Sequence, residues 1–179
     1  RSAMQIVSGD LGWFINGDVR TSGVAVNDGR WHHVGVTRDA SNQFDLWIDG
    51  TPHSIGSYST AIDSGDYDWL MGGRSADNAR NYAGLLDDVR VYDHALSASE
   101  IRALPGEIGM AHWKLDETSP GPVVDSASSY DGTNNGATIN RAGVHGRAYA
   151  FDGVSDRIDT NSATVVPTSD PFTILAWIK

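Results

Sequence analysis

The sequence predicts an all-β sandwich, and three observations lead to this fold class. Strand-like segments of alternating or apolar character recur about every 8–12 residues, which is the spacing found in sandwiches and barrels. The charged residues include 20 Asp and 11 Arg but only 3 Glu and 2 Lys, so good helix formers are scarce. The chain also has 20 Gly, 6 Trp and 6 Tyr, a composition typical of strands joined by many turns.

Alternating segments in the first hundred residues predict most of the strands. Residues 31–38 and 44–49 alternate polar and apolar side chains, so each segment has one face suited to a core. The dipeptide Asp49-Gly50 follows directly and favours a tight hairpin turn. Further strands are expected at residues 11–15, 23–26, 51–55, 67–72 and 84–92, with a polar loop at 73–82.

One short helix is expected near residues 97–104. Ser97 and Glu100 have the spacing of a capping box, in which each side chain bonds the backbone N–H of the other residue. The dipeptide Pro105-Gly106 ends the helical pattern. A helix of about two turns should lie on the surface of the sandwich rather than form its core.

The second part of the chain follows a connector at residues 105–110. Residues 117–146 show little periodicity, whereas residues 172–178 (FTILAWI) carry apolar side chains on both faces of a strand. A strand that is apolar on both faces is expected to be covered on both sides. Strands are predicted at residues 111–116, 147–152, 156–160 and 172–178.

Several segments together resemble the laminin-G-like, concanavalin A-like jelly-roll domain. Residues 29–38 (GRWHHVGVTR) and 44–50 (FDLWIDG) are similar to the middle of that domain. Residues 84–97 (GLLDDVRVYDHALS) resemble its closing strand and helix. Residues 111–117 (AHWKLDE) resemble its opening strand, and residues 171–178 (PFTILAWI) a later one. The resemblance implies a two-sheet antiparallel jelly-roll sandwich.

The order of these segments differs from that of the family. The closing half, residues 1–104, precedes the opening half, residues 111–179. The chain is therefore either a junction between two tandem repeats, cut from a larger protein, or a circular permutant. Both allow one closed sandwich over residues 1–179, since domain termini commonly lie close together. We expect a monomer, with a dimer formed by exchange of halves as the alternative.

Charge and composition exclude several classes of partner. The formal net charge of −10 argues against nucleic-acid binding and against anionic membrane surfaces. No apolar run reaches the ~18 residues of a spanning helix, so membrane insertion is not expected. The chain has no cysteine, which excludes disulfides, thiolate metal sites and a thiol nucleophile. The family resemblance implies a secreted or cell-surface protein.

The carboxylate pattern does not favour catalysis, and we expect no catalytic residues. A glycosidase needs two carboxyl groups that face each other across ~5–9.5 Å. Glu100 is explained by the capping box. Glu117 adjoins Asp116, so the side chains of Asp116 and Glu117 would point to opposite faces of a strand. The Gly-x-Ser-x-Gly pattern of a hydrolase nucleophile is also absent.

Calcium is the cofactor that the sequence and the resemblance together suggest. Asp152 and Asp156 bring two carboxylates into one tight loop, in which Gly153 allows a sharp bend. Hard oxygen ligands of this kind suit calcium, and calcium often sits at the rim in the resembling family. The alternative is that these aspartates only initiate turns.

Asp87 and Asp88 are the second pair of candidate metal ligands. Strand alternation predicts that Asp87 lies on the buried face of Val89 and Val91 and that Asp88 points the other way. A buried carboxylate without a partner is costly, so Asp87 should meet loop amides, an arginine or a cation.

A loop rich in polar and aromatic residues is the strongest candidate for ligand binding. Such loops on a rigid sandwich commonly carry recognition, although a solvated surface is the alternative. The strand tryptophans, including Trp177, are expected mainly in the core, and His33 is expected to be a packed strand histidine. The candidate ligand-binding residues are Arg74, Asp77, Asn78, Arg80 and Tyr82.

These observations favour a non-catalytic binding or adhesion module with a carbohydrate or protein ligand. The alternatives are a structural spacer repeat without a ligand and, less favoured, a glucanase-like hydrolase. Because a fold does not determine a function, this choice depends partly on the family resemblance.

Overall fold

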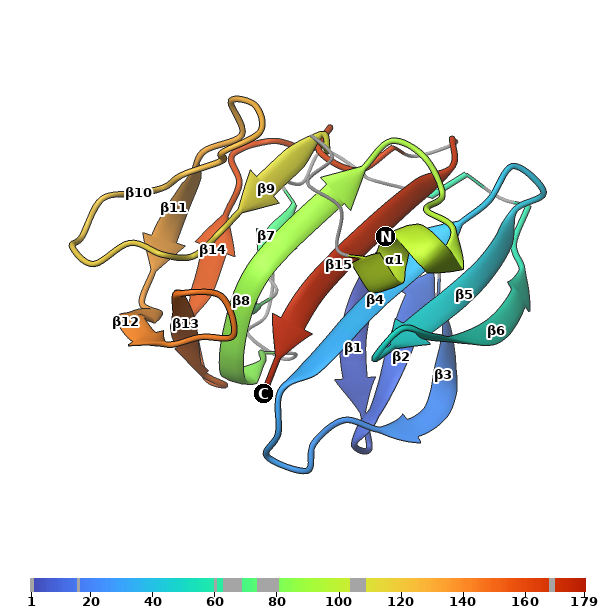
Figure 1. The fold of residues 1–179 in the computed structure, drawn as a ribbon, viewed down its shortest axis with the longest axis horizontal. Coiled ribbons are helices and arrows are strands. Elements are labelled where there is room, and N and C mark those ends of the chain that lie inside the picture. Colours follow the sequence, from blue (N-terminus) through green and yellow to red (C-terminus); the bar gives the residue numbers. More distant parts are fainter. Residues whose placement is uncertain are drawn as a thin grey trace.

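Two β-layers face each other across an apolar core in the computed structural model (Figure 1). The structure describes residues 2–15, 17–59, 61–62, 69–73, 81–103, 109–167 and 170–179. In chain order the strands are β1 (Ser2–Val7), β2 (Asp10–Ile15), β3 (Asp18–Ala25), β4 (His32–Arg38), β5 (Gln43–Ile48), β6 (Thr51–Ser57), β7 (Leu70–Met71), β8 (Ala83–Tyr92), β9 (Ala111–Trp113), β10 (Pro122–Val123), β11 (Gly132–Asn135), β12 (Thr138–Ala142), β13 (Arg147–Asp152), β14 (Arg157–Asp159) and β15 (Phe172–Ile178), and the helix α1 spans Ala98–Ala103.

The larger layer is an eight-stranded sheet whose strands come from both parts of the chain. Its order is β12-β13-β8-β15-β4-β5-β6, and β9 pairs with β8 beside this path. The facing layer consists of a three-stranded sheet, β1-β2-β3, and a four-stranded sheet, β10-β11-β14-β7. The strand pairs given for all three sheets are antiparallel, so the all-β antiparallel sandwich predicted from the sequence is confirmed.

Strand β15 lies in the middle of the large sheet, between β8 and β4. Its residues Phe172, Ile174, Ala176 and Ile178 face the main core between the layers. Leu175 faces the opposite side and belongs to a second apolar cluster. The prediction of a strand covered on both faces is therefore confirmed. Its two neighbours both precede residue 104, so the two parts of the chain complete one sheet.

Helix α1 covers the second apolar cluster on the outer face of the large sheet (Figure 1). The predicted capping box is present, since Ser97 N donates to Glu100 Oε2 over 2.6 Å and Glu100 N donates to Ser97 Oγ over 3.3 Å. The buried members of this cluster are Trp47, Tyr92, Leu96, Ile101 and Leu175. In the described part of the chain, no helix is long and apolar enough to cross a membrane.

A bulge in β8 changes which side chains face the core. Asp87 lies opposite Trp177 and Arg90 opposite Leu175, so three steps on β8 match two on β15. Asp88 adopts a φ of 52°, as expected for an extra residue in a strand. The prediction that Asp87 shares a face with Val89 is therefore wrong. The bulge resets the alternation and places Asp87 with Arg90 on the outer face.

The predicted strands in the first part are largely confirmed, and the differences lie where pairing is short. The Asp49-Gly50 turn has φ values of 50° and 75°, as in a tight hairpin. Of the strand expected at 67–72, the structure shows Leu70–Met71, and residues 67–68 lie outside the described ranges. Strand β1 was not expected, and the segment 117–146 contains β10, β11 and β12.

Truncating one core side chain of the central strand β15 should destabilise the whole fold. Ile174 is 2% exposed and lies in the main core, so Ile174→Ala should lower the free energy of unfolding by about 2–5 kcal/mol. Urea denaturation measures this loss. Val154→Ala is the control, because Val154 is 66% exposed and its truncation should change stability by less than about 0.5 kcal/mol. Equal effects of the two substitutions would contradict the central position of β15.

Candidate functional site

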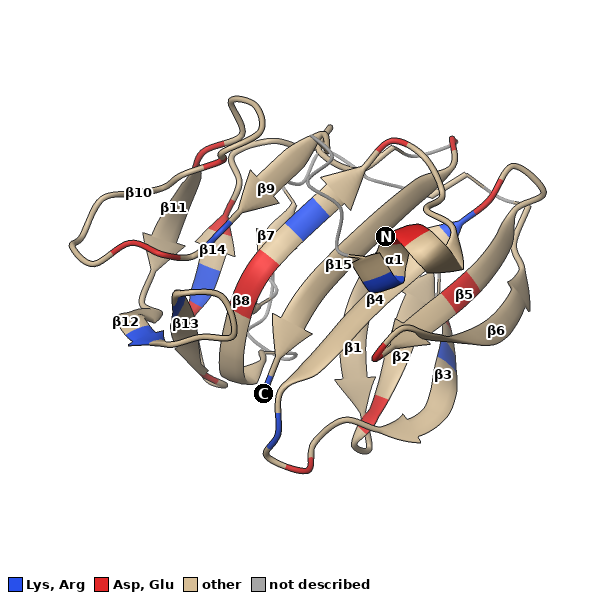
Figure 2. Ribbon diagram, viewed as in Figure 1, with Lys and Arg blue, Asp and Glu red and all other residues tan. Residues whose placement is uncertain are grey.

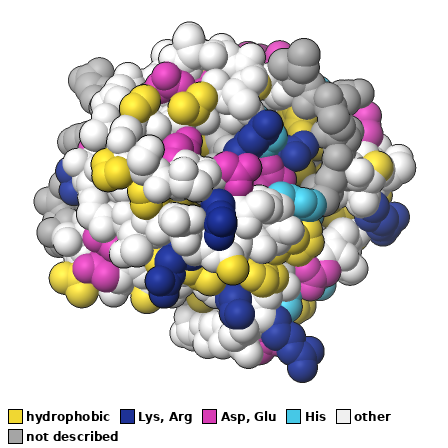
Figure 3. All heavy atoms as spheres, turned by 60° about the vertical axis from the view of Figure 1, so that its left-hand side comes forward, with side chains coloured by type: hydrophobic (Ala, Val, Ile, Leu, Met, Phe, Trp, Pro, Cys, Tyr) yellow, Lys and Arg dark blue, Asp and Glu magenta, His cyan; other side chains and the backbone are white. Residues whose placement is uncertain are grey.

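Polar and aromatic side chains gather on the outer face of the large sheet, beside helix α1. Figure 2 shows acidic and basic residues together in the middle of β8, in contrast to the uncharged strand β15 next to it. Figure 3 shows acidic, basic and histidine side chains close together on this side of the molecule. We define the outer-face cluster as His33 on β4, Asp87, Asp88 and Arg90 on β8, His112 on β9, His145 in the β12–β13 loop and Trp177 on β15.

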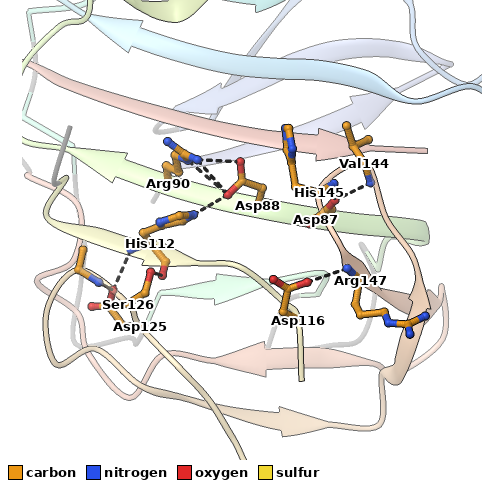
Figure 4. Close-up of polar contacts among 11 residues, drawn as sticks. Asp87, Asp88, Arg90, His112, Asp116, Asp125, Ser126, Val144, His145 and Arg147 are labelled. Atoms are coloured by element: carbon orange, nitrogen blue, oxygen red, sulfur yellow. Dashed lines mark hydrogen bonds and ion pairs between the residues drawn. The ribbon is translucent and has the colours of Figure 1, made fainter. Parts of the chain in front are cut away.

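Asp88 is the charged centre of this cluster (Figure 4). It is 5% exposed and forms an ion pair with Arg90, whose Nη2 lies 3.1 Å from Asp88 Oδ2. His112 Nε2 hydrogen-bonds Asp88 Oδ1 from β9. Burial acts to raise the pKa of Asp88, but the His112 hydrogen bond and the Arg90 charge outweigh it and hold the pKa below its ordinary value. Asp88 is therefore an ionised carboxylate that pairs with Arg90 and is hydrogen-bonded by His112.

Asp87 is fully buried and is held by the loop between β12 and β13 (Figure 4). Its Oδ2 accepts hydrogen bonds from Val144 N over 2.7 Å and His145 N over 2.9 Å. Burial raises the pKa of Asp87 to about 6. Within the described structure, its Oδ1 has no hydrogen-bond partner. The expectation that Asp87 meets loop amides is confirmed for one of its two oxygens.

Trp177 lies directly opposite Asp87 on β15 and is flanked by two histidines. The ring of His33 is 5.0 Å away at 45°, and the ring of His145 is 6.0 Å away at 70°. Trp177 is half-buried, so it is not the core tryptophan that strand alternation suggested. Its Nε1 is buried and, among the described residues, has no acceptor.

His33 is a buried, uncharged member of this cluster. It is 6% exposed, and burial lowers its pKa to about 4, so the ring is uncharged at neutral pH. The packed strand histidine predicted from the sequence is confirmed by this burial. Its backbone N–H also donates to Asp49 Oδ1 over 2.9 Å, which fixes the start of β4.

The cluster thus holds one donor and one acceptor that lack partners. Trp177 Nε1 can only donate, and ionised Asp87 Oδ1 can only accept. Both atoms are buried, and their residues are opposite each other on the same face. Buried polar atoms are nearly always paired, so an unpaired couple of this kind needs an explanation. A hydroxyl group or a water molecule has the chemistry to pair with either atom, because it can both accept and donate a hydrogen bond.

A hollow of about 390 Å³ lies next to His112. Ser126 on its wall donates through Oγ to the carbonyl oxygen of His112 over 3.0 Å. Two acidic residues of the hollow have structural roles: Asp116 Oδ1 accepts Arg147 N over 2.6 Å, and Glu117 Oε1 accepts Val124 N over 2.8 Å. The lining residues are Lys114, Asp116, Glu117, Thr118, Val124 and Ser126.

The loop predicted to bind a ligand falls mostly outside the described residues. Arg74, Asp77, Asn78 and Arg80 all lie in the range 74–80, which the structure does not describe. Tyr82 is described, and its hydroxyl lies 3.0 Å from the carbonyl oxygens of both Leu85 and Lys179. Burial raises its pKa to about 12. Its polar group therefore anchors the end of β15.

Asp152 and Asp156 share one tight loop, as the sequence suggested. Asp152 Oδ1 accepts the backbone N–H groups of Val154 and Ser155 over 2.8 and 3.0 Å. Asp156 Oδ2 accepts Asp152 N over 2.9 Å. The amide hydrogen bonds lower the pKa of Asp152. These bonds form the turn itself, which was the alternative interpretation of the pair.

The four candidate metal ligands do not come together. Asp152 pairs with Ala83, four residues from Asp87 on β8, which corresponds to about 13 Å along the strand. In the described part of the chain, no group of three or more His, Asp or Glu side chains is placed to hold a metal ion. The calcium site remains a prediction that would need further oxygen ligands beyond these carboxylates.

Most of the outer-face cluster was missed from the sequence. Arg90, His112 and His145 were not singled out, and His33 and Trp177 were interpreted only as packing residues. One signal was present, since two adjacent aspartates inside a strand imply that one of them breaks the alternation or requires a charged partner. The partners come from other strands, which the local pattern does not identify.

The comparison with known families agrees with this architecture. The model of the concanavalin A-like lectin/glucanases superfamily, a laminin G type, matches residues 3–102. The chain therefore belongs to the concanavalin A-like lectin/glucanases superfamily. No solved structure matches the chain significantly. The match confirms the family suggested by the sequence, while the order of the two halves is not part of what it shows.

Removing the Asp88 charge should destabilise the protein more than removing a surface charge. Asp88→Asn leaves Arg90 and His112 without their common anion, and we expect a loss of about 3–5 kcal/mol in unfolding free energy at pH 7. The control is Asp18→Asn, because Asp18 forms an ion pair with Arg20 in which both side chains are over 40% exposed. That variant should change stability by less than about 1 kcal/mol in the same urea titration. If Asp88→Asn left the unfolding free energy unchanged, the result would contradict a structural role for this ion-pair network.

Proposed function

We propose that the chain is a non-catalytic, carbohydrate-binding module of a secreted or cell-surface protein, with its ligand at the outer-face cluster. The observation that carries this proposal is the unpaired couple of Trp177 Nε1 and Asp87 Oδ1. Membership of a superfamily of lectins and glucanases supports a sugar ligand. A protein ligand is the second candidate, and the binding experiment below separates the two.

A sugar hydroxyl has the chemistry that the couple requires. It accepts a hydrogen bond from the indole N–H and donates one to the carboxylate oxygen. A hydrogen bond to a charged acceptor contributes about 1.5–3 kcal/mol, more than one between neutral groups. The half-buried Trp177 also offers apolar ring surface for the C–H groups of a sugar.

Both atoms of the couple are buried, and we propose that a ligand reaches them when the ring of His145 moves. Asp87 is fully buried under the β12–β13 loop, whereas His145 in that loop is exposed. The ring of His145 lies edge-on to Trp177, 6.0 Å away. A bound sugar takes the place of this ring while the backbone N–H groups of Val144 and His145 keep holding Asp87 Oδ2.

The same geometry favours binding over hydrolysis. Asp88 already neutralises Arg90 and hydrogen-bonds His112, so it is held ionised and engaged. Asp87 is adjacent in sequence and fully buried. A glycosidase instead needs two reachable carboxyl groups on either side of the scissile bond. A spacer without a ligand is the other alternative, in which ordered water rather than a sugar hydroxyl would pair with the two atoms.

A glycan array probed with the intact protein, with and without calcium, tests the proposal. We expect binding of a defined glycan, followed by calorimetric titration of that glycan against variants. Trp177→Phe removes the donor and keeps an aromatic ring, and Asp87→Asn removes the charge and keeps the shape. Each should weaken binding by about tenfold or more. Thermal melting of each variant shows whether it is folded.

Trp47→Phe is the matched control on the same outer face. Trp47 Nε1 donates to Thr37 Oγ1 over 2.9 Å beneath helix α1, so its loss should lower stability without changing glycan affinity. An array that stays silent with and without calcium would contradict a carbohydrate ligand. Binding that Trp177→Phe and Asp87→Asn leave unchanged would move the site away from the outer-face cluster.

Calcium remains a proposal that comes from the family and from the aspartate-rich loops. Asp152 and Asp156 each accept backbone hydrogen bonds with one carboxylate oxygen, so the other oxygen of each is the candidate calcium ligand. The array with and without calcium decides whether the ion supports binding. An unchanged melting midpoint after prolonged EDTA treatment would contradict a structural calcium.

We also propose that the chain is one sandwich with the two halves of the family domain in permuted order. The support is that β15 of the second part lies between β8 and β4 of the first. A closed single chain should have a mass in solution of 19.2 kDa by light scattering. Twice that mass would indicate a dimer that exchanges halves through the connector.

A further inference from the structure

A second polar site lies at the start of β4 and is separate from the outer-face cluster. Both ring nitrogens of His32 face carboxylates: Nδ1 is 2.8 Å from Asp49 Oδ2, and Nε2 is 3.0 Å from Asp28 Oδ1. Asp28 belongs to the turn between β3 and β4, where its Oδ1 also accepts Arg30 N over 2.9 Å. Asp49 belongs to the hairpin turn between β5 and β6. His32 therefore joins two turns that are far apart in sequence.

This arrangement requires a charged imidazole. A neutral ring carries one N–H, so it can donate to only one carboxylate and turns a lone pair toward the other. The imidazolium donates to both and places a positive charge between two negative ones. Burial acts to lower the pKa of His32, but the hydrogen bonds to Asp49 and Asp28 outweigh it and raise the pKa above 6.5.

The other groups around His32 leave this balance in place. Ile178, which lies opposite His32 on β15, is uncharged. Arg30 is 83% exposed and lies 3.7 Å from the second oxygen of Asp28. Arg102 of α1 reaches the same hairpin turn, where its Nε donates to the carbonyl oxygen of Gly50 over 3.0 Å.

We propose that His32 is a proton-dependent latch that holds the β3–β4 and β5–β6 turns together. The latch is closed while His32 is an imidazolium and both aspartates are ionised, and it opens when the imidazole loses its proton. Asp49 Oδ1 also accepts the backbone N–H of His33 over 2.9 Å. The latch therefore also holds the start of β4, where the ring of His33 contacts the ring of Trp177. The latch itself does not depend on the proposed carbohydrate function.

The direction of the pH dependence follows from these contacts. Because the folded pKa of His32 is raised above 6.5, its stabilisation is complete below pH 6.5 and is lost as pH rises through the folded value. The pKa of Asp28 is lowered below 3.8, mainly by the Arg30 backbone N–H and by His32, so its contribution is lost only in strong acid. The latch is thus closed below pH 6.5 and opens as the pH rises through the raised pKa of His32.

Imidazole nitrogen NMR of the intact protein, recorded across pH, tests the latch. His32 should titrate above pH 6.5, whereas its neighbour His33 should stay neutral down to about pH 4. Asp28→Asn and Asp49→Asn should each move the His32 midpoint down toward 6.5. The amide resonances of His33 and of the two turns should shift with the same midpoint as His32.

Two controls separate the latch from a merely structural role. Asp93→Asn removes the carboxylate beside the exposed His94 and should leave the His32 midpoint unchanged. His32→Gln should abolish the shift of the turn amides with pH, whatever its effect on overall stability. A His32 midpoint at or below 6.5 would overturn the proposal, as would turn amides that do not respond while His32 titrates. Neither result depends on whether a glycan binds.

Discussion

The structure depends on one strand that is apolar on both faces. β15 must be covered on each side, and the chain does this with the two smaller sheets on the inner face and with α1 on the outer face. Its neighbours β8 and β4 come from the first part of the chain, so the two parts together complete the sheet. Figure 1 shows α1 over one part of this sheet, and the residues of the outer-face cluster come from β4, β8, β9, β15 and the β12–β13 loop.

The bulge in β8 determines the chemistry of that face. One extra residue in a strand moves every following side chain to the opposite side, and here it places two adjacent carboxylates on the outer face. Buried charge is tolerated only with partners, which explains why Arg90, His112 and the β12–β13 amides converge there. One oxygen of Asp87 and the indole N–H of Trp177 stay without partners among the described residues, and the proposed carbohydrate site is built on these two atoms.

Two adjacent histidines show how strand alternation separates charge states. His33 is buried beside Trp177 on the outer face of the large sheet, and this burial makes its neutral form the stable one at neutral pH. His32 lies at the start of β4, between two turns, and each of its ring nitrogens faces one carboxylate. The backbone places them one residue apart, yet their environments shift their pKa values in opposite directions. Asp49 contacts both residues and so connects the turn region with the outer-face cluster.

The sequence by itself determined the features that short stretches of chain control. The alternating strands, the Ser97–Glu100 capping box, the Asp49-Gly50 turn and the tight Asp152–Asp156 loop all follow from residues within a few positions of each other. Only the tertiary structure decided the short strands within 117–146, because they exist through pairing with β13, with β14 and with each other rather than through their own pattern. It also decided the face of Asp87, which depends on the register against β15, and it assembled the outer-face cluster from β4, β8, β9, β15 and one loop. Local preference acts over a few residues, whereas register and convergence are set by which strands bury their apolar faces together.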